Sequence, residues 1–357
     1  MSKIVDIYNR LGLLRVKIPR LIDAHKELKM KKDNFPFKQP TKEQYEAIKS
    51  FWRGIKPNIK YLSLYNYDNE VFDPRYIPDD IYYTKVDMYF NNGIECFSLD
   101  DKNLYDLYFP DVKQPKTIAR KNNGLFTNEK YEIISLQSVV ERCRAQGEVI
   151  IKKSTLSNGG KNITFWRVTD GDDILITLLA EPHNYIIQEV VSQHSSIGKI
   201  HPSSLNSIRV LSLTYENQVH ILSTIVRMGV NGNNVDNGHS GGIFCGVNND
   251  GQFKDMAYSY MTGERFYDIH PSSNVKFSDC HIPNFTVCKE TIKRLAPRLS
   301  RFSRLTSWDF TIDTDGNPVL IEVNLAYGGL FFHQIANGPV FGELTERVLN
   351  EIFNRKS

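Results

Sequence analysis

Two acidic residues near the C-terminus have the spacing of partners in a β-hairpin. The apolar segments on either side of residues 314–317 (Thr-Asp-Gly-Asn) predict two strands joined by a tight turn. Pairing across this turn places Asp313 opposite Pro318 and, four residues further from the turn on each strand, Asp309 opposite Glu322. Directly opposed residues have Cβ atoms about 5 Å apart, so we expect the carboxylates of Asp309 and Glu322 to meet on one face of the hairpin.

The chemistry that suits this arrangement is the binding of a hard metal ion. Asn324 lies two residues beyond Glu322 and points to the same face, so two carboxylates and an amide oxygen converge. Mg²⁺, or Mn²⁺ in its place, would offset the repulsion between Asp309 and Glu322 and keep its other positions for phosphate oxygens. If so, we expect replacement of either carboxylate to abolish turnover with little loss of fold. The alternative is a solvated acidic hairpin with one raised carboxyl pKa and no metal.

A lysine at the end of another predicted strand is suited to phosphate. Lys152 ends the apolar stretch 148–152, and a loop rich in Ser, Asn and Gly follows at 154–162. Backbone N–H groups and hydroxyls of such a loop can surround phosphate oxygens while the ammonium supplies charge. The loop is not a P-loop, because GxxxxGK[ST] does not occur, and a plain surface turn is the alternative.

Two arginines lie within apolar stretches that predict neighbouring strands. Arg209 and Arg227 would be costly there without an anionic partner. That partner is either a phosphate or carboxylate of a ligand or an internal salt bridge. Residues 236–242 form a second polar, Gly-rich loop that lets a backbone approach a ligand closely. His239 in this loop is either a general base or simply solvated.

The elements that must position these residues are of both kinds, which predicts the α+β class. A capping box at Thr41–Gln44 opens a helix that reaches Trp52, and Ser135 caps a helix that ends at Gly147. Further helices are expected near 287–302 and 342–353, with strands at 148–152, 162–168, 184–191, 207–215, 219–228, 242–247 and 252–258. Residues 57–115 are rich in Tyr, Asp and Pro and give no clear pattern.

The N-terminal segment has a basic amphipathic pattern. Residues 1–32 carry nine Lys or Arg, and apolar residues recur at helical spacing from Ile4 to Leu21. Such a helix can lie on an anionic membrane surface. The simpler interpretation is a helix that docks on its own domain and leaves a solvated basic face.

The bulk composition excludes several classes of function. The chain has 357 residues, 41% of them hydrophobic, and a net charge of +3, which gives no reason to expect a nucleic-acid partner. No stretch of about 18 uncharged apolar residues predicts a membrane span. The five cysteines form no CxxC pair, so we expect free thiols and a cytoplasmic protein, at the inner face of the membrane if the N-terminal helix binds lipid. Nothing in the composition predicts the oligomeric state.

The order of these motifs resembles the ATP-grasp superfamily, and most of all the sugar-transfer-associated ATP-grasp proteins. The resemblance runs from about Thr41 to the C-terminus. It is carried by DDKN (100–103), VIIKKSTLSNGGKNITF (149–165), IIQEVV (186–191), HPSSLNSIRVLSL (201–213), VRMGVNGNNVDNGHSGGI (226–243) and WDFTIDTDGNPVLIEVNLAYGG (308–329). It implies an ATP-grasp fold, in which two α+β subdomains hold ATP between them. Residues 1–98 would form an atypical N-terminal region, 99–190 the lid subdomain and 191–357 the C-terminal subdomain with the metal hairpin.

The resemblance also implies a role for individual residues. It makes Asp309, Glu322 and Asn324 magnesium ligands and makes Arg209 and Arg227 catalytic contacts to phosphate or substrate. Residues implied to bind the nucleotide are two lysines, two loop residues of the phosphate lid and a hinge segment that holds adenine and ribose: Lys102, Lys152, Ser157, Gly159, Gln188, Glu189, Val191 and Gln193.

The reaction that the resemblance implies is an ATP-dependent ligation of a carboxylate and an amine through an acyl phosphate. The carboxylate would be a small molecule or sugar-linked, the amine an amino acid or similar, and the pathway surface polysaccharide or glycoconjugate biosynthesis. Two other readings remain: an ATP-grasp kinase that phosphorylates a hydroxyl, and a nucleotide-binding scaffold without turnover.

Overall fold

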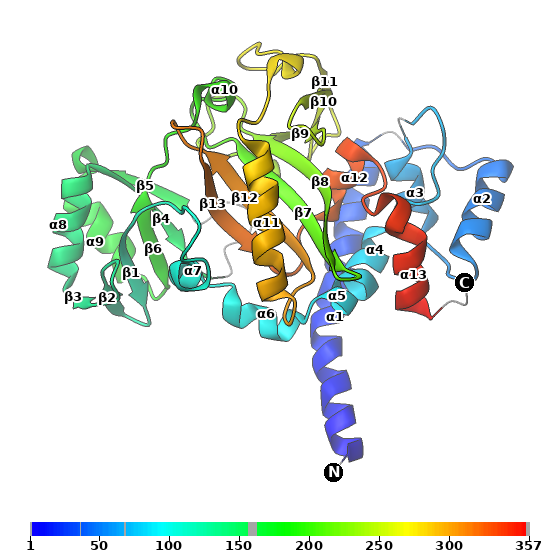
Figure 1. The fold of residues 1–357 in the computed structure, drawn as a ribbon, viewed down its shortest axis with the longest axis horizontal. Coiled ribbons are helices and arrows are strands. Elements are labelled where there is room, and N and C mark those ends of the chain that lie inside the picture. The colour runs from blue at the N-terminus through cyan, green and yellow to red at the C-terminus, as the bar shows by residue number, and fades with distance from the viewer. Residues whose placement is uncertain (1, 36, 68, 156–162, 355–357) are drawn as a thin grey trace.

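The chain folds around two antiparallel β-sheets, as the computed structural model in Figure 1 shows. The structure describes residues 2–35, 37–67, 69–155 and 163–354. Within these residues the hydrophobic side chains form three cores, one behind the smaller sheet and one on each face of the larger sheet. This mixture of helices and antiparallel sheets confirms the predicted α+β class.

The larger sheet has seven strands and carries most of the candidate site. Its strand order is β11-β10-β9-β8-β7-β12-β13. The strands are β7 (Ser207–Tyr215), β8 (Gln218–Met228), β9 (Ile243–Val247), β10 (Phe253–Ser259), β11 (Arg265–Tyr267), β12 (Leu305–Ile312) and β13 (Pro318–Asn324). Helix α11 (Phe285–Leu299) packs on one face, where alternate residues of β7 such as Ile208 and Val210 point. The next residues along β7, Arg209 and Leu211, therefore point to the opposite face.

That opposite face is covered by the two ends of the chain. Leu211 and Leu213 share a core there with helices from the N-terminal region and with the C-terminal helices. The N-terminal helices are α1 (Ser2–Asn34), α2 (Lys42–Trp52), α3 (Ile59–Tyr65), α4 (Asp79–Ile81), the π-helical turn η1 (Tyr82–Val86) and α5 (Asp87–Phe90). The C-terminal ones are α12 (Leu330–Asn337), the 3₁₀ turn η6 (Gly342–Leu344) and α13 (Thr345–Phe353).

The smaller sheet has six strands in the order β3-β2-β1-β6-β4-β5 and lies to one side of the larger sheet (Figure 1). Its strands are β1 (Thr117–Asn122), β2 (Leu125–Thr127), β3 (Ile133–Ile134), β4 (Glu148–Lys153), β5 (Ile163–Arg167) and β6 (Tyr185–Glu189). Helices α8 (Leu136–Gln146) and α9 (Asp172–Ala180) cover it from outside, and their apolar residues complete its core. The remaining short helices are α6 (Gly93–Leu99), η2 (Lys102–Leu104), α7 (Tyr105–Tyr108), η3 (Val168–Asp170), α10 (Ser195–Gly198), η4 (Gly238–Ser240) and η5 (Phe277–Asp279).

The connection into the smaller sheet packs on the larger one. Tyr105 and Phe109 belong to the core under α11, and only from Thr117 onward does the chain enter the six-stranded sheet. The subdomain boundaries at 98/99 and 190/191 stay a prediction.

The hairpin that motivated the metal hypothesis has an irregular register. Asp309 pairs with Glu322, as predicted. Nearer the turn, however, Ile312 rather than Asp313 pairs with Pro318, so the register predicted there was wrong by one residue. A bulge between Asp309 and Phe310 in the pairing compensates for this shift. The turn itself is closed by Asp313, whose carboxylate accepts hydrogen bonds from the N–H groups of residues 315 and 317.

Helix α1 both docks and projects. Its C-terminal half packs on α3, α4 and η1, where Ala24 and Leu28 are buried. Its N-terminal half extends away from the body of the molecule (Figure 1). Leu14, Ile18 at the middle of the helix, and Ile22 one turn further on are about half exposed. Over the ranges that the structure describes, no helix combines the length and the hydrophobicity that a membrane crossing requires.

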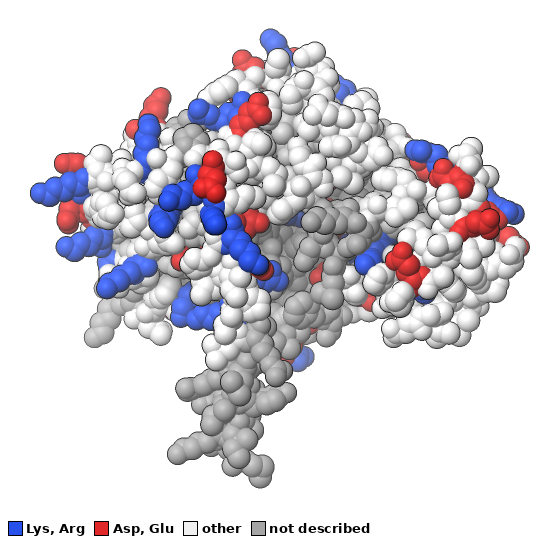
Figure 2. All heavy atoms as spheres, turned by 180° about the vertical axis from the view of Figure 1, so that it is seen from behind, with Lys and Arg blue, Asp and Glu red and all other residues white. Residues whose placement is uncertain are grey.

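The surface and the thiols agree with the composition. Basic and acidic side chains lie interspersed over the face seen in Figure 2. All five cysteines are buried and free, as predicted.

Candidate functional site

A cavity of about 750 Å³ brings most of the predicted site residues together. It is bordered by the edge of the smaller sheet, by strands β7, β8, β12 and β13 of the larger sheet, and by α1. The predicted site residues that line it are Lys102, Lys152, Arg209, Arg227, Asp309, Glu322 and Asn324. Apolar side chains, Ile150, Ile163, Phe165 and Ile321, lie among them.

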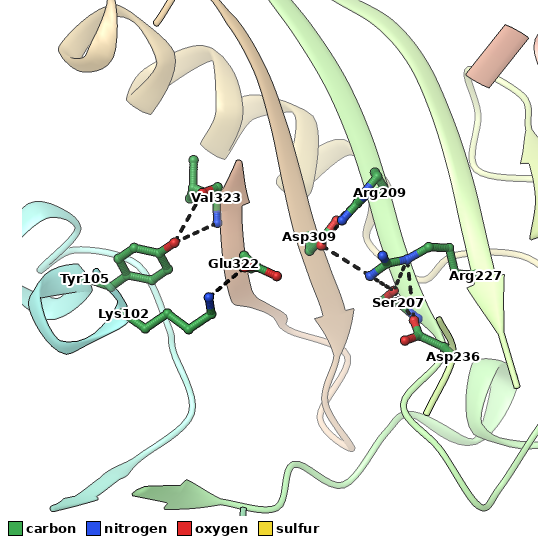
Figure 3. A network of polar contacts seen from close by, with 9 residues as sticks. All are labelled: Lys102, Tyr105, Ser207, Arg209, Arg227, Asp236, Asp309, Glu322 and Val323. Carbon is green, nitrogen blue, oxygen red and sulfur yellow. Dashed lines mark hydrogen bonds and ion pairs between the residues drawn. The ribbon is translucent and has the colours of Figure 1, made fainter. Parts of the chain in front are cut away.

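The central feature of the cavity is a row of charged residues across three strands. Asp309 on β12 lies opposite Glu322 on β13 and opposite Arg209 on β7. Figure 3 shows how cations approach this row from both sides, with Lys102 at Glu322 and the arginines at Asp309. The repulsion expected between the two carboxylates is therefore compensated by protein cations in this structure.

Glu322 is paired with Lys102. The Lys102 ammonium donates to Glu322 over 2.6 Å, and only 8% of the lysine is exposed. Burial alone lowers the pKa of Lys102, but the neighbouring carboxylate outweighs burial and raises it above its ordinary value. The backbone N–H of Lys102 donates to the carbonyl of Ser154, which fixes the lysine next to the end of β4. The lysine thus connects the strand of the smaller sheet to the acidic hairpin of the larger one.

Asp309 is held by two arginines. Arg209 donates from Nε and Nη2 to the two carboxylate oxygens, over 2.7 and 2.6 Å, and Arg227 adds a third contact over 3.2 Å. Asp309 is 1% exposed. Burial alone raises the pKa of Asp309, but Arg209 and Arg227 outweigh it and lower the value to about 2. Of the two partners left open for the arginines, the internal salt bridge is the one that the structure shows.

A polar chain continues from Arg227 into the Gly-rich loop. Arg227 donates from Nε and Nη2 to the Ser207 hydroxyl, over 2.9 and 2.7 Å, and its Nε lies 3.6 Å from Asp236. The Ser207 hydroxyl in turn donates to Asp236. Ser207 was not among the predicted site residues. The signal that could have marked it is the predicted pairing of strands 207–215 and 219–228, which places Ser207 opposite Arg227, as the structure does.

The hairpin offers a donor set that fits a divalent cation. Glu322 and Asn324 point into the cavity, and the buried Asn324 amide nitrogen has no hydrogen-bond partner among the described residues. Because the two ends of an amide are interchanged by a rotation, the same position can present the oxygen to a metal. The carboxylate of Asp309 is already engaged by two guanidinium groups. A cation would therefore meet Glu322 and Asn324 first and share Asp309 with the arginines.

Lys152 has no ion-pair partner among the residues that the structure describes. It projects from β4 into the cavity, and the polar contact recorded for it is with the Gln188 amide oxygen, at 3.4 Å. Burial, together with the nearby charge of Lys102, lowers the pKa of Lys152 to about 8. Lys152, Lys102, Arg209 and Arg227 outnumber the three carboxylates at this end of the cavity, Asp236, Asp309 and Glu322, which leaves a net charge of +1. Such a surplus suits a polyanionic ligand.

The residues predicted to hold adenine and ribose lie outside the cavity lining. Gln188 and Glu189 are on β6, and the Glu189 carboxylate accepts from the N–H of Lys116 while its own N–H donates to the Lys116 carbonyl. The Gln193 amide is bonded to Asn206 and to the Ser204 carbonyl. The roles of Gln188, Glu189, Val191 and Gln193 stay predictions. Ser157 and Gly159, predicted to contact phosphate, fall outside the residues that the structure describes.

Of the far end of the cavity, only the 236–242 loop with His239 was singled out from the sequence. There Glu27 and Lys31 of α1 and Asp79 of α4 lie beside the rings of Tyr260 and Phe332. Glu27 and Lys31 are one helical turn apart, next to the buried Ala24 and Leu28, which is the one local signal that could have marked them. His239 also reaches this end, where it contacts Glu27 at 3.2 Å. It is therefore not simply solvated.

Comparison with known proteins places the chain in a family. The model of the sugar-transfer associated ATP-grasp family matches residues 84–350. The chain belongs to this family. The match confirms the resemblance read from the motifs and contains the acidic hairpin, both lysines and both arginines, whereas α1 through α4 precede it. No curated protein sequence matches the chain.

Solved structures with a similar fold are ATP-grasp enzymes of low sequence identity. The ATP-grasp ligase PsnB, complexed with a minimal precursor, has a TM-score of 0.42 and 14% identity over 75% of this chain and 64% of its own. D-cycloserine synthetase DcsG has a TM-score of 0.41 and 14% identity over 71% and 72%. D-alanyl-alanine synthetase A from Vibrio cholerae O1 biovar eltor has a TM-score of 0.41 and 12% identity over 72% and 65%. The matched region thus spans slightly less than two thirds of the PsnB chain.

Proposed function

We propose that this protein is an ATP-dependent ligase that joins a carboxylate to an amine through an acyl phosphate. The observation that supports this most directly is the gathering of Lys102, Lys152, Arg209 and Arg227 around the acidic hairpin in one cavity. Cations that surround a metal-binding donor set are what the transfer of a phosphoryl group requires, because charge must be neutralised as the group moves. Membership of an ATP-grasp family is consistent with this chemistry.

In the proposed reaction the γ-phosphate of ATP passes to an oxygen of the substrate carboxylate. ADP leaves, the amine nitrogen then attacks the acyl carbon, and inorganic phosphate and the amine proton depart. Glu322, Asn324 and Asp309 hold Mg²⁺, or Mn²⁺ in its place, which neutralises the phosphate oxygens when bound. Lys102 and Lys152 bind and orient the phosphates, and Arg209 and Arg227 face the acyl phosphate. The apolar side chains of Ile150, Ile163, Phe165 and Ile321 exclude water, which would otherwise hydrolyse the acyl phosphate.

The substrates proposed for the reaction are a small or sugar-linked carboxylate and an amino acid or other amine. The family description associates these proteins with sugar transfer, which supports a role in surface polysaccharide or glycoconjugate biosynthesis. We further propose that the projecting half of α1 contacts an anionic membrane surface, because Leu14, Ile18 and Ile22 are exposed on a helix that also carries basic residues.

The test of the proposed reaction is a screen of substrates with three readouts. Uronic acids, nucleotide sugars and amino acids are crossed with ATP and Mg²⁺ while ADP, inorganic phosphate and product mass are measured. A ligase releases ADP and phosphate in equal amounts, requires the amine and yields an amide. A kinase instead yields ADP and a stable phosphorylated product without an amine. A non-catalytic scaffold binds ATP without turnover. Glu322→Gln serves as the inactive control, and full activity of that variant would contradict the proposed role of the hairpin.

A further inference from the structure

The cavity has a second end that the phosphate chemistry does not use. It is formed by α1, α4, the start of α12 and the 236–242 loop, and α1 and α4 lie outside the matched family region. Glu27 and Lys31 enter it from α1 and Asp79 from α4, while Tyr260, Phe331 and Phe332 form an aromatic wall. The kind of ligand that this end could bind is therefore inferred from the contacts of these residues.

Glu27 is the anionic centre of this end. Its Oε1 lies 3.2 Å from His239 Nε2. Its Oε2 accepts a hydrogen bond from the Tyr260 hydroxyl and lies 3.5 Å from the Lys31 ammonium. Burial alone raises the pKa of Glu27, but the hydrogen bond from His239 and the charge of Lys31 outweigh burial and lower it to about 2. The carboxylate is therefore ionised at any physiological pH.

The aromatic wall already holds one ammonium group. The Lys31 nitrogen lies 3.3 Å from the centre of the Phe331 ring and 4.8 Å from that of Tyr260. Tyr260 stacks on Phe332, with ring centres 4.7 Å apart and planes inclined by 21°. The negative faces of such rings attract cations. The wall is thus of a kind that stabilises a positively charged nitrogen.

Two carboxylates face one ammonium at the inner part of this end. Lys31 is 1% exposed and lies 3.9 Å from Asp79 as well as 3.5 Å from Glu27. At the rim Asp23 and Lys26 offset each other, and Arg20, which stacks on Tyr327 at 3.4 Å, balances the charge of the whole end. Glu27 and Asp79 would repel the carboxylate of a ligand here, whereas the ammonium group of a ligand would find an anionic partner.

The second end lies within reach of the phosphate end. Asp236, which contacts Arg227, and His239, which contacts Glu27, are three residues apart in one loop. Three residues span at most about 11 Å between Cα atoms. Gly238 between them packs so closely on Tyr260 that an added Cβ would lie 2.8 Å from the tyrosine Cβ. The loop is therefore held directly against the aromatic wall and connects the two ends of the cavity.

We propose that Glu27, Tyr260 and Phe332 form the binding site of the amine co-substrate. This assignment rests on the proposed ligase function and extends it, because it gives the two substrates different places. The carboxylate binds at the cationic end near Arg209, and the amine binds as its ammonium form between Glu27 and the aromatic wall. The ammonium releases one proton to water before its nitrogen attacks the acyl carbon. The N-terminal region, which the family model does not include, then selects the amine.

The test measures binding rather than turnover. The full chain is saturated with a non-hydrolysable ATP analogue and Mg²⁺, and ethanolamine, D-glucosamine and cadaverine are titrated by ligand-observed NMR. Each amine has an uncharged counterpart: ethylene glycol, N-acetyl-D-glucosamine and 1,5-pentanediol. We expect at least one amine to bind and its counterpart not to bind. Glu27→Gln should weaken that binding by about tenfold or more, since it removes the charge and keeps the shape. Phe332→Leu, which keeps the carboxylate, should weaken it about threefold to tenfold.

Glu141→Gln on the exposed face of α8 is the matched control and should bind amine as the wild type does. The assignment is overturned if no amine binds the wild type, if the uncharged counterparts bind equally well, or if Glu27→Gln and Phe332→Leu both bind amine normally. The ATP analogue separates this result from a failure of the proposed function. Loss of analogue binding in the wild type contradicts the ligase proposal, whereas normal analogue binding without amine discrimination contradicts the amine site alone.

Discussion

At the scale of single residues, the two arginines that contact Asp309 mean that replacing this carboxylate should destabilise the fold, which the sequence did not suggest. Removing Asp309 leaves Arg209 buried without its carboxylate, and breaking a buried ion pair in this way costs about 3–5 kcal/mol. We therefore expect Asp309→Asn to lower the denaturant midpoint markedly, and we no longer expect a near-normal fold. Asp111→Asn, in an exposed pair with Arg298, should cost about 1 kcal/mol or less. If the two variants lose equal amounts of unfolding free energy, the ion pair between Asp309 and the arginines does not stabilise the fold as we expect.

The same pair makes a prediction about pH. The pKa of Asp309 is about 2 in the folded protein and about 3.9 in an unfolded chain, so the pair stabilises the fold above about pH 5. This contribution is lost as the pH falls towards 2. The difference in unfolding free energy between the wild type and Asp309→Asn should therefore shrink over that interval. Urea titration measures this difference at each pH. If it stays constant from pH 6 to pH 2.5, the titration of Asp309 does not control the stability.

Lys152 should couple nucleotide binding to proton uptake. With its pKa near 8 in the free protein, a bound polyphosphate favours the charged form and raises that pKa. ATP binding should therefore take up protons between about pH 7.5 and 9 and weaken as the pH rises through this range. Calorimetry in buffers of different ionisation enthalpy measures the uptake. Lys152→Arg, which stays charged, should bind ATP without it, and an unchanged uptake would exclude Lys152 as its source.

The sequence located part of this site and not the rest. Asp309 and Glu322 were found because strand pairing across a short turn is local. The bulge beyond them left that pairing correct although the register near the turn was wrong. Glu27 could not be connected with His239 or Tyr260, because these contacts join segments more than 200 residues apart. Patterns within a short stretch of sequence do not show which residues far apart in the chain will contact each other.

At the scale of elements, helices with caps were predictable and unpatterned segments were not. The capping box at Thr41 and the Ser135 cap began their helices at the expected places. In residues 57–115, which gave no pattern, the described part of the chain contains seven short helical segments and the lysine that reaches Glu322. Those short helices are held by tertiary packing, as the burial of Tyr61, Leu62 and Tyr82 shows, rather than by local propensity.

The projecting half of α1 predicts a lipid-dependent association. Because its exposed apolar residues lie on a helix that also carries basic residues, the protein should bind vesicles that contain about one third phosphatidylglycerol. Binding should weaken as salt is added. Ile18→Glu should reduce the bound fraction in a sedimentation assay. Ile174→Glu, at a similarly exposed isoleucine of α9, is the matched control. Equal binding to neutral vesicles, or an unaffected Ile18→Glu variant, would show that this half of the helix has another role.

At the scale of the whole molecule, the cavity lies between elements of both sheets, so a ligand there should stabilise the entire fold. A ligand at a hundred times its dissociation constant adds about 2.7 kcal/mol to the folded state. We expect ATP with Mg²⁺ to raise the melting temperature and chelation of the metal by EDTA to remove most of that rise. Glu322→Gln should show little dependence on Mg²⁺. A shift of the same size with and without metal in the wild type would contradict the hairpin ligands.

The contact between Lys102 and Glu322 puts an ammonium group in the position of a counter-ion at the hairpin. A metal that binds Glu322 would therefore have to replace this ammonium. When the metal and the nucleotide bind together, the lysine that the metal displaces can pair with the nucleotide phosphates. The metal alone would displace the ammonium without giving it a partner, and the nucleotide alone would draw the ammonium away and leave Glu322 without a counter-ion. Under the proposed function, we therefore expect the metal–nucleotide complex to bind better than either component alone.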